Sequence, residues 1–455
     1  MIKNIWENRP TLPSFVVFEL EQKYTGQSRI DKISQICDVV SEQNCSHHLV
    51  TTLDDIAWIF NIRSKDVECN PVTISYAVIA PSGTTLFIDA HKVSADLKTI
   101  FAEEGISIRP YDDIENYLAN LSPTDKILIN PNTISNQLYN TIPSDCIVRG
   151  ETISTRLKAQ KNKTEIANIR QAMLKDGVAL TKLYRWLDAQ LDHIAPTEVE
   201  VANQLHQFRA EQANFFGDSF SAIVGYKGNG AIVHYHPEVA TCARLKRDGI
   251  LLLDSGGQYL EGTTDITRTT ALGKPTDEQK RNFTLVLKGH IGIDLLKFPH
   301  GTRGNQMEIL ARQHLWQYGL NYGHGTGHGV GHFLNVHEGP QTIGSGVTGK
   351  AATPFEIGMF TSNEPGYYKA NEYGIRIENL ILTVEDETTD FGQFLKFETM
   401  TLFPIDQSLI DVSMLTQTEI DWLNQYHATV AEQLCPLLNT AEQDWMREQC
   451  KPIDE

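Results

Sequence analysis

Several features that would place this chain in a common class are absent from its 455 residues. The longest apolar runs, such as residues 249–253, are strand-sized, whereas a transmembrane helix needs about 20 apolar residues. The first 15 residues contain neither the apolar core nor the small-residue cleavage site of a secretory signal. The sequence therefore predicts no membrane partner and a cytoplasmic location.

Cysteine and basic residues are also scarce. The seven cysteines are odd in number, widely separated and never arranged as C-x-x-C, so neither a disulfide framework nor a cysteine zinc knuckle is expected. Lys and Arg total 39 against 57 Asp and Glu, which gives a formal charge of −18. Because this charge repels phosphate, we expect no nucleic-acid partner.

The sequence does not contain the common motifs for binding nucleotides or zinc. A G-x-G-x-x-G motif built on Gly325 and Gly327 would need glycine where Val330 stands, and no G-K-[ST] sequence follows a glycine loop. The stretch that begins His337-Glu338 is not H-E-x-x-H, because Gly and Pro follow and Gln341 takes the place of the second histidine.

The pattern of elements predicts two domains. Helices expected at 28–42, 53–60, 94–103 and 114–121 alternate with strands at 48–51, 75–79, 85–88 and 126–129, which is typical of a small α/β domain over 1–155. A polar break at 148–163 precedes a second domain over 156–455. This domain opens with a long helix whose apolar stripe comprises Ile166, Ile169, Met173, Leu180, Leu183, Leu187 and Leu191. Thr197 and Glu200 form a capping box for the next helix.

Two aspartates mark the ends of neighbouring strands. Asp254 follows the apolar run 251–253, and Asp265 precedes the strand-like run 266–268, with glycines between them that predict a tight hairpin. Taken alone, each Asp could simply be a residue that caps a turn. Together, buried and adjacent, they would repel one another unless a cation or a shared proton neutralised them.

Four of the fifteen histidines fall between His324 and His337. Glycine occupies every odd position from 323 to 331, which disfavours a helix and predicts an extended or looped chain. In an extended chain His324, Thr326, His328 and His332 would face one way. A group of histidines on one face predicts a binding site.

Two further carboxylates complete the candidate set. Pro365 favours extended geometry at Glu364. In the run 374–379, alternation places Arg376 and Glu378 on one face and isoleucines on the other. An exposed Arg–Glu surface pair is the alternative interpretation of these two. Four carboxylates with one imidazole favour two divalent ions, of Mn²⁺, Co²⁺ or Zn²⁺, and hydrolysis of an amide or ester.

These motifs, in this order, resemble those of the pita-bread metallopeptidases, a family that includes methionine aminopeptidase, prolidase and aminopeptidase P. The strings around Asp254, His324–His328, His337, Glu364–Tyr368 and Arg376–Glu378 most closely resemble cytosolic Xaa-Pro aminopeptidase, and the likeness runs over the whole chain. The resemblance implies a creatinase-type α/β domain followed by a pita-bread catalytic domain. The implied metal ligands are Asp254, Asp265, His328, Glu364 and Glu378.

The resemblance also implies an activity and residue roles. The chain would be a metalloaminopeptidase that hydrolyses the N-terminal Xaa-Pro bond of peptides through a hydroxide bridging two ions, most readily Mn²⁺. Glu364 would carry the proton, His234 and His337 would contact the peptide and the oxyanion, and His324, Tyr368 and Arg376 would line the proline pocket. His332 and His236 receive no role. A homodimer is also implied.

Relatives of the three-domain type carry another α/β domain before the segment that corresponds to Ile5, so we expect either a shortened member or a fragment. Two alternatives therefore stay open. One is prolidase, which cleaves Xaa-Pro dipeptides, and the other is a metal-bound but inactive homologue that acts as a peptide-binding module.

Overall fold

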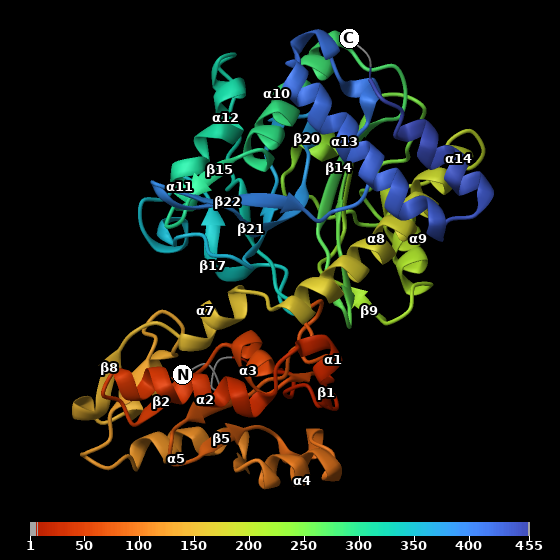
Figure 1. Ribbon diagram of the computed structural model, residues 1–455. Helices are drawn as coiled ribbons and strands as arrows, with labels where there is room; N and C mark the ends of the chain where they lie inside the picture. The colour runs from red at the N-terminus through yellow and green to blue at the C-terminus, as the bar shows by residue number, and fades with distance from the viewer. Residues whose placement is uncertain (1–5, 7, 454–455) are drawn as a thin grey trace. The chain divides into compact units, whose positions relative to one another are not determined.

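A computed structural model describes residue 6 and residues 8–453, and it divides the chain into two compact units, Met1–Lys158 and Ala159–Glu455 (Figure 1). Within the described part no helix is long and apolar enough to cross a membrane. All seven cysteines lie in that part and are free thiols.

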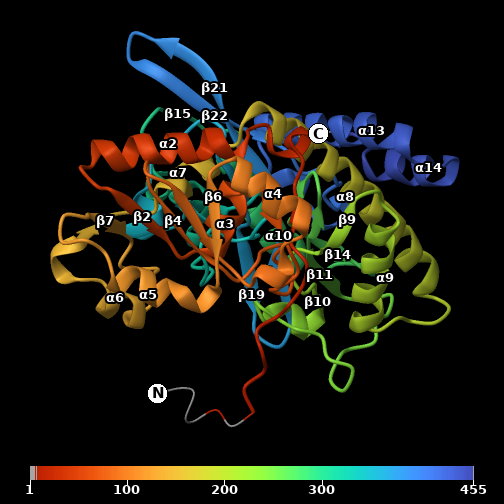
Figure 2. The same cartoon turned by 90° about the horizontal axis from the view of Figure 1, so that it is seen from below.

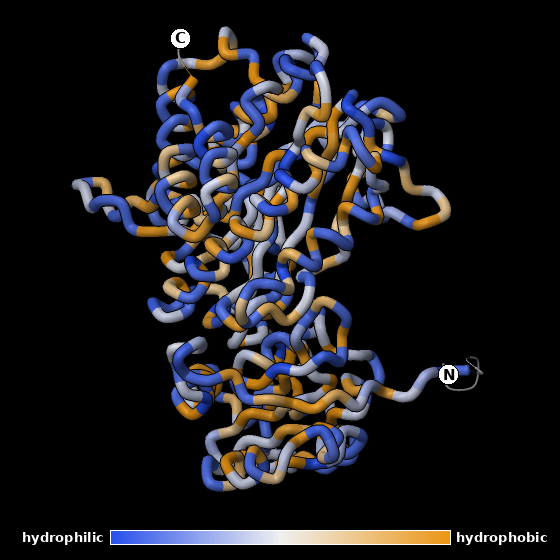
Figure 3. The backbone as a smooth tube through the Cα atoms, turned by 90° about the vertical axis from the view of Figure 1, so that its right-hand side faces the viewer, coloured by the Kyte–Doolittle hydropathy of each residue, from blue (hydrophilic) through white to orange (hydrophobic). Residues whose placement is uncertain are grey.

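The first unit is built on a mixed six-stranded sheet of order β6-β5-β4-β2-β7-β8. The predicted hairpin is confirmed as the antiparallel pair β4–β5, whereas β5–β6, β2–β7 and β7–β8 are parallel. The strands of this whole unit are β1 (Phe18–Glu19), β2 (His47–Val50), β3 (Ile62–Arg63), β4 (Tyr76–Ile79), β5 (Thr84–Phe87), β6 (Ile106–Arg109), β7 (Ile127–Ile129) and β8 (Ile147–Arg149). The strands are apolar along much of their length, and the tube inside this unit is accordingly orange in Figure 3.

Four helices lie at the predicted places: α2 (Arg29–Glu42), α3 (Leu53–Ile59), α4 (Ala95–Glu103) and α5 (Ile114–Ala119). The sequence did not predict α1 (Gln22–Thr25), α6 (Asn136–Thr141) and α7 (Ile153–Ala159). Ser28 and Ser94 cap α2 and α4 by accepting a hydrogen bond from the third helical N–H. The chain divides into its two units after Lys158, inside the polar stretch 148–163, and β8 and α7 occupy much of that stretch.

The second unit combines four small sheets. Their strand orders are β10-β11-β14, β13-β12-β9, β15-β22-β21-β18-β16-β17 and β19-β20. The strands are β9 (Phe215–Asp218), β10 (Ile223–Tyr226), β11 (Ile250–Ser255), β12 (Gly257–Tyr259), β13 (Gly262–Thr263), β14 (Ile266–Ala271), β15 (Lys297–Pro299), β16 (Gly327–Gly329), β17 (Glu338–Ile343), β18 (Phe360–Asn363), β19 (Gly366–Lys369), β20 (Tyr373–Arg376), β21 (Asn379–Thr389) and β22 (Gly392–Thr399). Figure 2 shows the β21–β22 ribbon extending outward from the rest of its sheet.

The helices of this unit are α8 (Lys163–Gln190), α9 (Glu198–Ala210), α10 (Asp277–Asp294), α11 (Gly304–Met307), α12 (Ile309–Trp316), α13 (Gln417–Leu434) and α14 (Thr440–Gln449). The predicted stripe of α8 is confirmed, since Ile169, Met173 and Leu183 are buried in the core. The predicted capping box of α9 is also present, with Thr197 and Glu200 each satisfying the other's backbone N–H.

Close packing between α10 and α12 yields a stability prediction. A Cβ added at Gly289 would lie 2.3 Å from the Ala311 carbonyl oxygen, whereas one at Gly292, a turn further along α10, would meet its nearest atom at 3.5 Å. We expect Gly289→Ala to destabilise the second unit by about 1–3 kcal/mol through overpacking. Gly292→Ala should stabilise it by up to about 1 kcal/mol, because alanine favours the helix.

Thermal and urea unfolding of both variants measure this difference. Equal effects of the two substitutions would contradict the close approach of α10 and α12 at Gly289.

Candidate metal centre

The five predicted ligands meet in one cavity of about 480 Å³ within the second unit. The cavity is lined by Phe220, Ser221, Ile223, Val233, His234, Tyr235, His236, Asp254, Asp265, His324, Gly325, Gly327, His328, His337, Thr342, Glu364, Arg376 and Glu378. Every predicted site residue except Tyr368 belongs to this lining. Loops and strand ends distant in sequence therefore contribute one polar chamber.

The two aspartates come from a pair of antiparallel strands. Asp254 lies near the end of β11 and is the Cα partner of Thr267 on β14, which begins directly after Asp265. The predicted tight turn between them was wrong: β12 and β13 form an additional hairpin there, and β12 also pairs with β9. Gly256 permits this, because a Cβ at that position would lie 2.0 Å from the Thr264 carbonyl oxygen.

His328 and Glu364 come from the neighbouring strands β16 and β18. The Ser362 hydroxyl links them, since it accepts from the His328 N–H at 2.9 Å and donates to Glu364 Oε1 at 3.1 Å. The close approach of the strands requires glycine at 327, where a Cβ would lie 1.9 Å from the Ser362 carbonyl oxygen. The glycine-rich sequence thus serves strand packing as well as chain extension.

Glu378 sits between β20 and β21, and its Oε2 accepts a hydrogen bond from the Thr267 hydroxyl at 2.7 Å. The predicted alternation is confirmed, because Ile375 and Ile377 are buried in the core while Arg376 and Glu378 line the cavity. The alternative of an exposed Arg–Glu surface pair was wrong: Arg376 and Glu378 are only 2% and 1% exposed.

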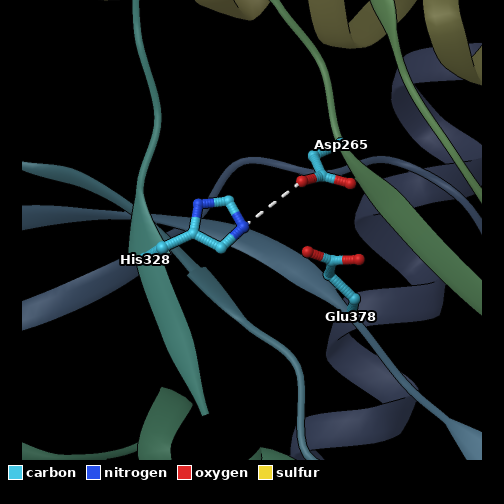
Figure 4. Close-up of side chains that lie close together, drawn as sticks. All are labelled: Asp265, His328 and Glu378. Carbon is cyan, nitrogen blue, oxygen red and sulfur yellow. Dashed lines mark ion pairs between the residues drawn. The ribbon is translucent and has the colours of Figure 1, made fainter. Parts of the chain in front are cut away.

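Asp265, His328 and Glu378 already have the spacing of a metal site (Figure 4). Each offers one ligand atom, and these three atoms lie within 4.8 Å of one another. The Nε2 of His328 is 3.6 Å from Asp265 Oδ2 and 3.5 Å from Glu364 Oε1. Its Nδ1 is 3.0 Å from the Gly329 carbonyl oxygen. That carbonyl accepts a hydrogen bond from the Nδ1–H group, so the lone pair of Nε2 faces the carboxylates.

Burial makes this cluster unfavourable as a set of free anions. Burial and the neighbouring carboxylates raise the pKa of Asp265 and Glu378 well above their ordinary values, and burial raises the pKa of Glu364 to about 8. Burial also lowers the pKa of His328 to about 3, so its imidazole is neutral and available as a ligand. These carboxylates need positive charge nearby in order to ionise at neutral pH.

The donor set fits divalent cations. Asp254 directs one oxygen to Arg376, at 2.5 Å, while its Oδ1 is buried without a hydrogen-bond partner. An orphaned buried carboxylate oxygen is costly unless a cation binds it. Four carboxylates and one neutral imidazole offer more oxygen ligands than a single zinc ion takes, and bridging carboxylates suit a pair of ions.

The predicted substrate residues surround this cluster. His337 packs edge-on to His328, with ring centroids 4.3 Å apart, and His234 lies across the same chamber. His324 receives a hydrogen bond at Nε2 from the Tyr368 hydroxyl at 2.8 Å, and that hydroxyl accepts from Arg376 at 2.6 Å. Tyr368 therefore lies behind His324 and Arg376, where it orients both.

One prediction for the glycine-rich segment was wrong. Only residues 327–329 form a strand, and the chain then turns at Phe333, whose φ is +48°. His332 is consequently buried outside the cavity lining, and Thr326 bonds to the Tyr322 hydroxyl at 2.6 Å. His324 and His328 are the members of that alternating set that reach the chamber.

Sequence reasoning missed the supporting hydroxyls and the apolar wall. Thr267 and Ser362 orient two ligands, and each stands two residues from a ligand carboxylate in an alternating strand. That spacing is a signal that could have identified them. Phe220 and Ile223 carry no motif, and only the folded chain brings them to the cavity.

A buried chamber of paired carboxylates and histidines, carried by small antiparallel sheets, defines a dinuclear metallohydrolase. Three family models match the chain in succession: the creatinase/prolidase N-terminal domain over residues 8–165, metallopeptidase family M24 over 167–385, and the C-terminal region of peptidase M24 over 393–453. These matches confirm the expected fold class.

Similar proteins match nearly the whole chain. The probable Xaa-Pro aminopeptidase P of Laccaria bicolor is 42% identical over 465 residues, which cover 100% of this chain and 72% of that protein. Xaa-Pro aminopeptidase 1 of Dictyostelium discoideum is 40% identical, covering 98% and 72%. The crystal structure of X-prolyl aminopeptidase from Caenorhabditis elegans, described as a cytosolic enzyme with a di-nuclear active site, matches with a TM-score of 0.94 and 35% identity over 99% of this chain and 75% of that one.

The chain therefore belongs to metallopeptidase family M24 and, within it, to the aminopeptidase P group. Xaa-Pro dipeptidase from Bacillus anthracis shares the fold, with a TM-score of 0.64 but only 21% identity over 83% of this chain and 99% of that one.

Glu364 makes the stability of the metal-free protein depend on pH. Its pKa is about 8 in the folded chain against an ordinary value of 4.5, so between these values the folded state retains a proton that the unfolded state releases. The free energy of unfolding must then fall as pH rises. From about pH 6.5 to 8 we expect a loss of about 2 kcal/mol for this carboxyl, measured by urea unfolding after chelation.

Excess Mn²⁺ should abolish this slope, because a bound cation replaces the proton in the folded state. Identical pH profiles with and without Mn²⁺ would contradict a cation site at these carboxylates.

Proposed function

We propose that this chain is a metal-dependent exopeptidase that removes the first residue from peptides whose second residue is proline. The observation that carries the proposal is the complete ligand set, Asp254, Asp265, His328, Glu364 and Glu378, gathered in one cavity. It occurs on a chain that is 42% identical to a probable Xaa-Pro aminopeptidase P. A family member that had lost metal ligands would not keep all five residue types.

We propose Asp265 and Glu378 as the bridging ligands, because they form the compact ligand group with His328 and both are almost fully buried. Asp254 would complete the ligand set of one ion. His328 and Glu364 would complete the ligand set of the other. Oxygen-rich coordination with one imidazole favours Mn²⁺, with Co²⁺ and Zn²⁺ as substitutes. When bound, two such ions supply a water of lowered pKa and polarise the scissile carbonyl.

Glu364 is proposed to move the proton. Its Oε1 is fixed by the Ser362 hydroxyl, and its backbone N–H donates to the Thr326 carbonyl at 2.7 Å, so the carboxylate has one orientation in the chamber. A carboxyl fixed inside the chamber suits a base that takes a proton from water and returns it to the leaving nitrogen. The prolyl nitrogen lacks a hydrogen before cleavage and gains this proton as it leaves.

Histidines would stabilise the reacting carbonyl. Burial lowers the pKa of His337, so its ring is neutral at pH 7 and donates through an N–H to the developing oxyanion. His234 also lines the chamber and is proposed to contact the peptide. The group of His324, Tyr368 and Arg376 would receive the proline ring of the substrate. Hydrogen bonds within this group hold the His324 and Tyr368 rings in place before the substrate binds.

Three further properties are proposed with this function. The di-nuclear relative from Caenorhabditis elegans is described as cytosolic, which supports a cytoplasmic location. A homodimer through the catalytic unit is supported by α12, which leaves Ile309 and Trp316 44% and 49% exposed. The partners would be peptides. Nucleic acid is not proposed as a partner, because the formal charge of −18 repels phosphate.

Glu364→Gln tests the assignment of the base. Because the amide cannot accept the water's proton, we expect kcat for an Xaa-Pro-Yaa peptide to fall by about 10²–10⁴ in metal-loaded protein. The matched control is Glu372→Gln, which removes an exposed carboxylate between β19 and β20. Turnover by Glu364→Gln equal to that of the control would contradict the proposed base.

Substrate length separates the two peptidase assignments. An Xaa-Pro aminopeptidase should cleave Xaa-Pro-Pro-Yaa, whereas a prolidase requires the free carboxylate of an Xaa-Pro dipeptide. We expect release of the first residue from the tetrapeptide, measured by mass spectrometry. Cleavage of the dipeptide alone would establish the prolidase assignment instead.

A further inference from the structure

A second cavity, of about 290 Å³, lies within the second unit between α8 and α14, which are neighbours in Figure 1. Tyr184 and Asp188 of α8 line it, as do Trp445 and Gln449 of α14, and the segment 403–408 supplies another wall. Over the described residues, its lining shares no member with that of the metal chamber. The proposed peptidase chemistry therefore does not use this cavity.

Aromatic rings form one wall of the cavity. The ring centroids of Tyr184 and Phe403 are 4.9 Å apart, and those of Phe403 and Trp445 are 6.2 Å apart. Leu187 and Leu272 add aliphatic groups to the same lining. A wall of this kind packs against a ligand body of phenyl size, and the faces of its rings also attract a cation.

The charged groups of the lining favour a cation as well. Asp188 and Asp406 are its carboxylates, and Arg247 is the one cation among its described residues. The guanidinium of Arg247 is already paired with two carboxylates, at 2.7 Å with Asp188 and at 2.8 Å with Asp192. An excess of carboxylate on a chain of formal charge −18 attracts organic cations and repels anions.

A buried hydroxyl in the lining indicates a ligand that is polar as well as apolar. Tyr184 is 7% exposed, and its hydroxyl is buried without a hydrogen-bond partner in the part of the chain that the structure describes. An unpaired buried hydroxyl costs free energy. A ligand with a polar head beside its apolar body would satisfy this group.

The cavity is connected to a metal ligand through one buried side chain. Arg268 donates to the carbonyl oxygens of Pro404 at 3.0 Å and Phe403 at 2.6 Å, and both residues line the cavity. The same guanidinium donates to the Glu378 carbonyl oxygen at 2.7 Å. A ligand packed against Phe403 and Pro404 would restrict these carbonyls, and through Arg268 it would hold Glu378 more firmly.

We propose that this cavity is a regulatory site for primary amines that carry an aromatic group, and that its occupation strengthens metal binding in the chamber. The ammonium group would lie near Asp188 and Asp406, and the aromatic body against Phe403 and Trp445. The inference goes beyond the proposed function, because it concerns metal affinity and does not require that a peptide is cleaved.

The first test compares 3-phenylpropylamine with 3-phenylpropanol, which has the same apolar body and no charge. Both are titrated by calorimetry into the Mn²⁺-loaded protein at pH 7. We expect the alcohol to bind about tenfold more weakly than the amine, because it lacks the cation that the rings and carboxylates attract. Gln449→Trp should fill the cavity and abolish binding of the amine.

Asp188→Asn and Asp192→Asn form a matched pair of variants. Both carboxylates pair with Arg247, and their side chains are 62% and 61% exposed, but of the two only Asp188 lines the cavity. Asp188→Asn should weaken amine binding about threefold, since an exposed charge contributes modestly. Asp192→Asn should leave amine binding as in the wild-type protein.

The regulatory part is tested by the affinity for Mn²⁺, measured from the electron paramagnetic resonance signal of the free ion. With saturating 3-phenylpropylamine we expect the Kd for Mn²⁺ to fall about fivefold in the wild-type protein and to stay unchanged in Gln449→Trp. Each of the following outcomes overturns the proposal: equal binding of amine and alcohol, equal effects of the two asparagine variants, or a Kd for Mn²⁺ that the amine does not change.

Discussion

The structure depends on the electrostatics of one chamber, in which four carboxylates share a buried space. Arg376 is the single Lys or Arg among the described residues that line it, and it is committed to Asp254 and Tyr368. Anions this close cannot all ionise in a low-dielectric setting without additional positive charge. Protons supply it at low pH, and under the proposed function divalent cations would supply it at working pH, so that metal binding would stabilise the folded state of this chain.

The surrounding framework holds these carboxylates together against their repulsion. Arg268 donates to the backbone oxygens of Glu378 and Phe403 and to the Tyr426 hydroxyl, so one buried guanidinium ties a metal ligand to the C-terminal segment and α13. This explains why the helices after residue 400 belong to the catalytic unit although they contribute no residue to the chamber. Removing them would release the segment between β20 and β21 that carries Glu378.

Much of this arrangement follows from local sequence. Alternation placed Arg376 and Glu378 on one face, and the capping box at Thr197 placed the start of α9, because both signals act within a few residues. The extra β12–β13 hairpin, the inward turn that buries His332 and the position of Tyr368 behind His324 depend on contacts with distant strands. Propensity and spacing contain no information about such packing.

The measurement that tests this account most directly is anomalous diffraction at the manganese edge from crystals grown with Mn²⁺. The account predicts two anomalous peaks, about 3.5–4 Å apart, between Asp254, Asp265, His328, Glu364 and Glu378, with Asp265 and Glu378 contacting both. A single peak, or none within reach of these five side chains, would contradict a dinuclear centre in this chamber.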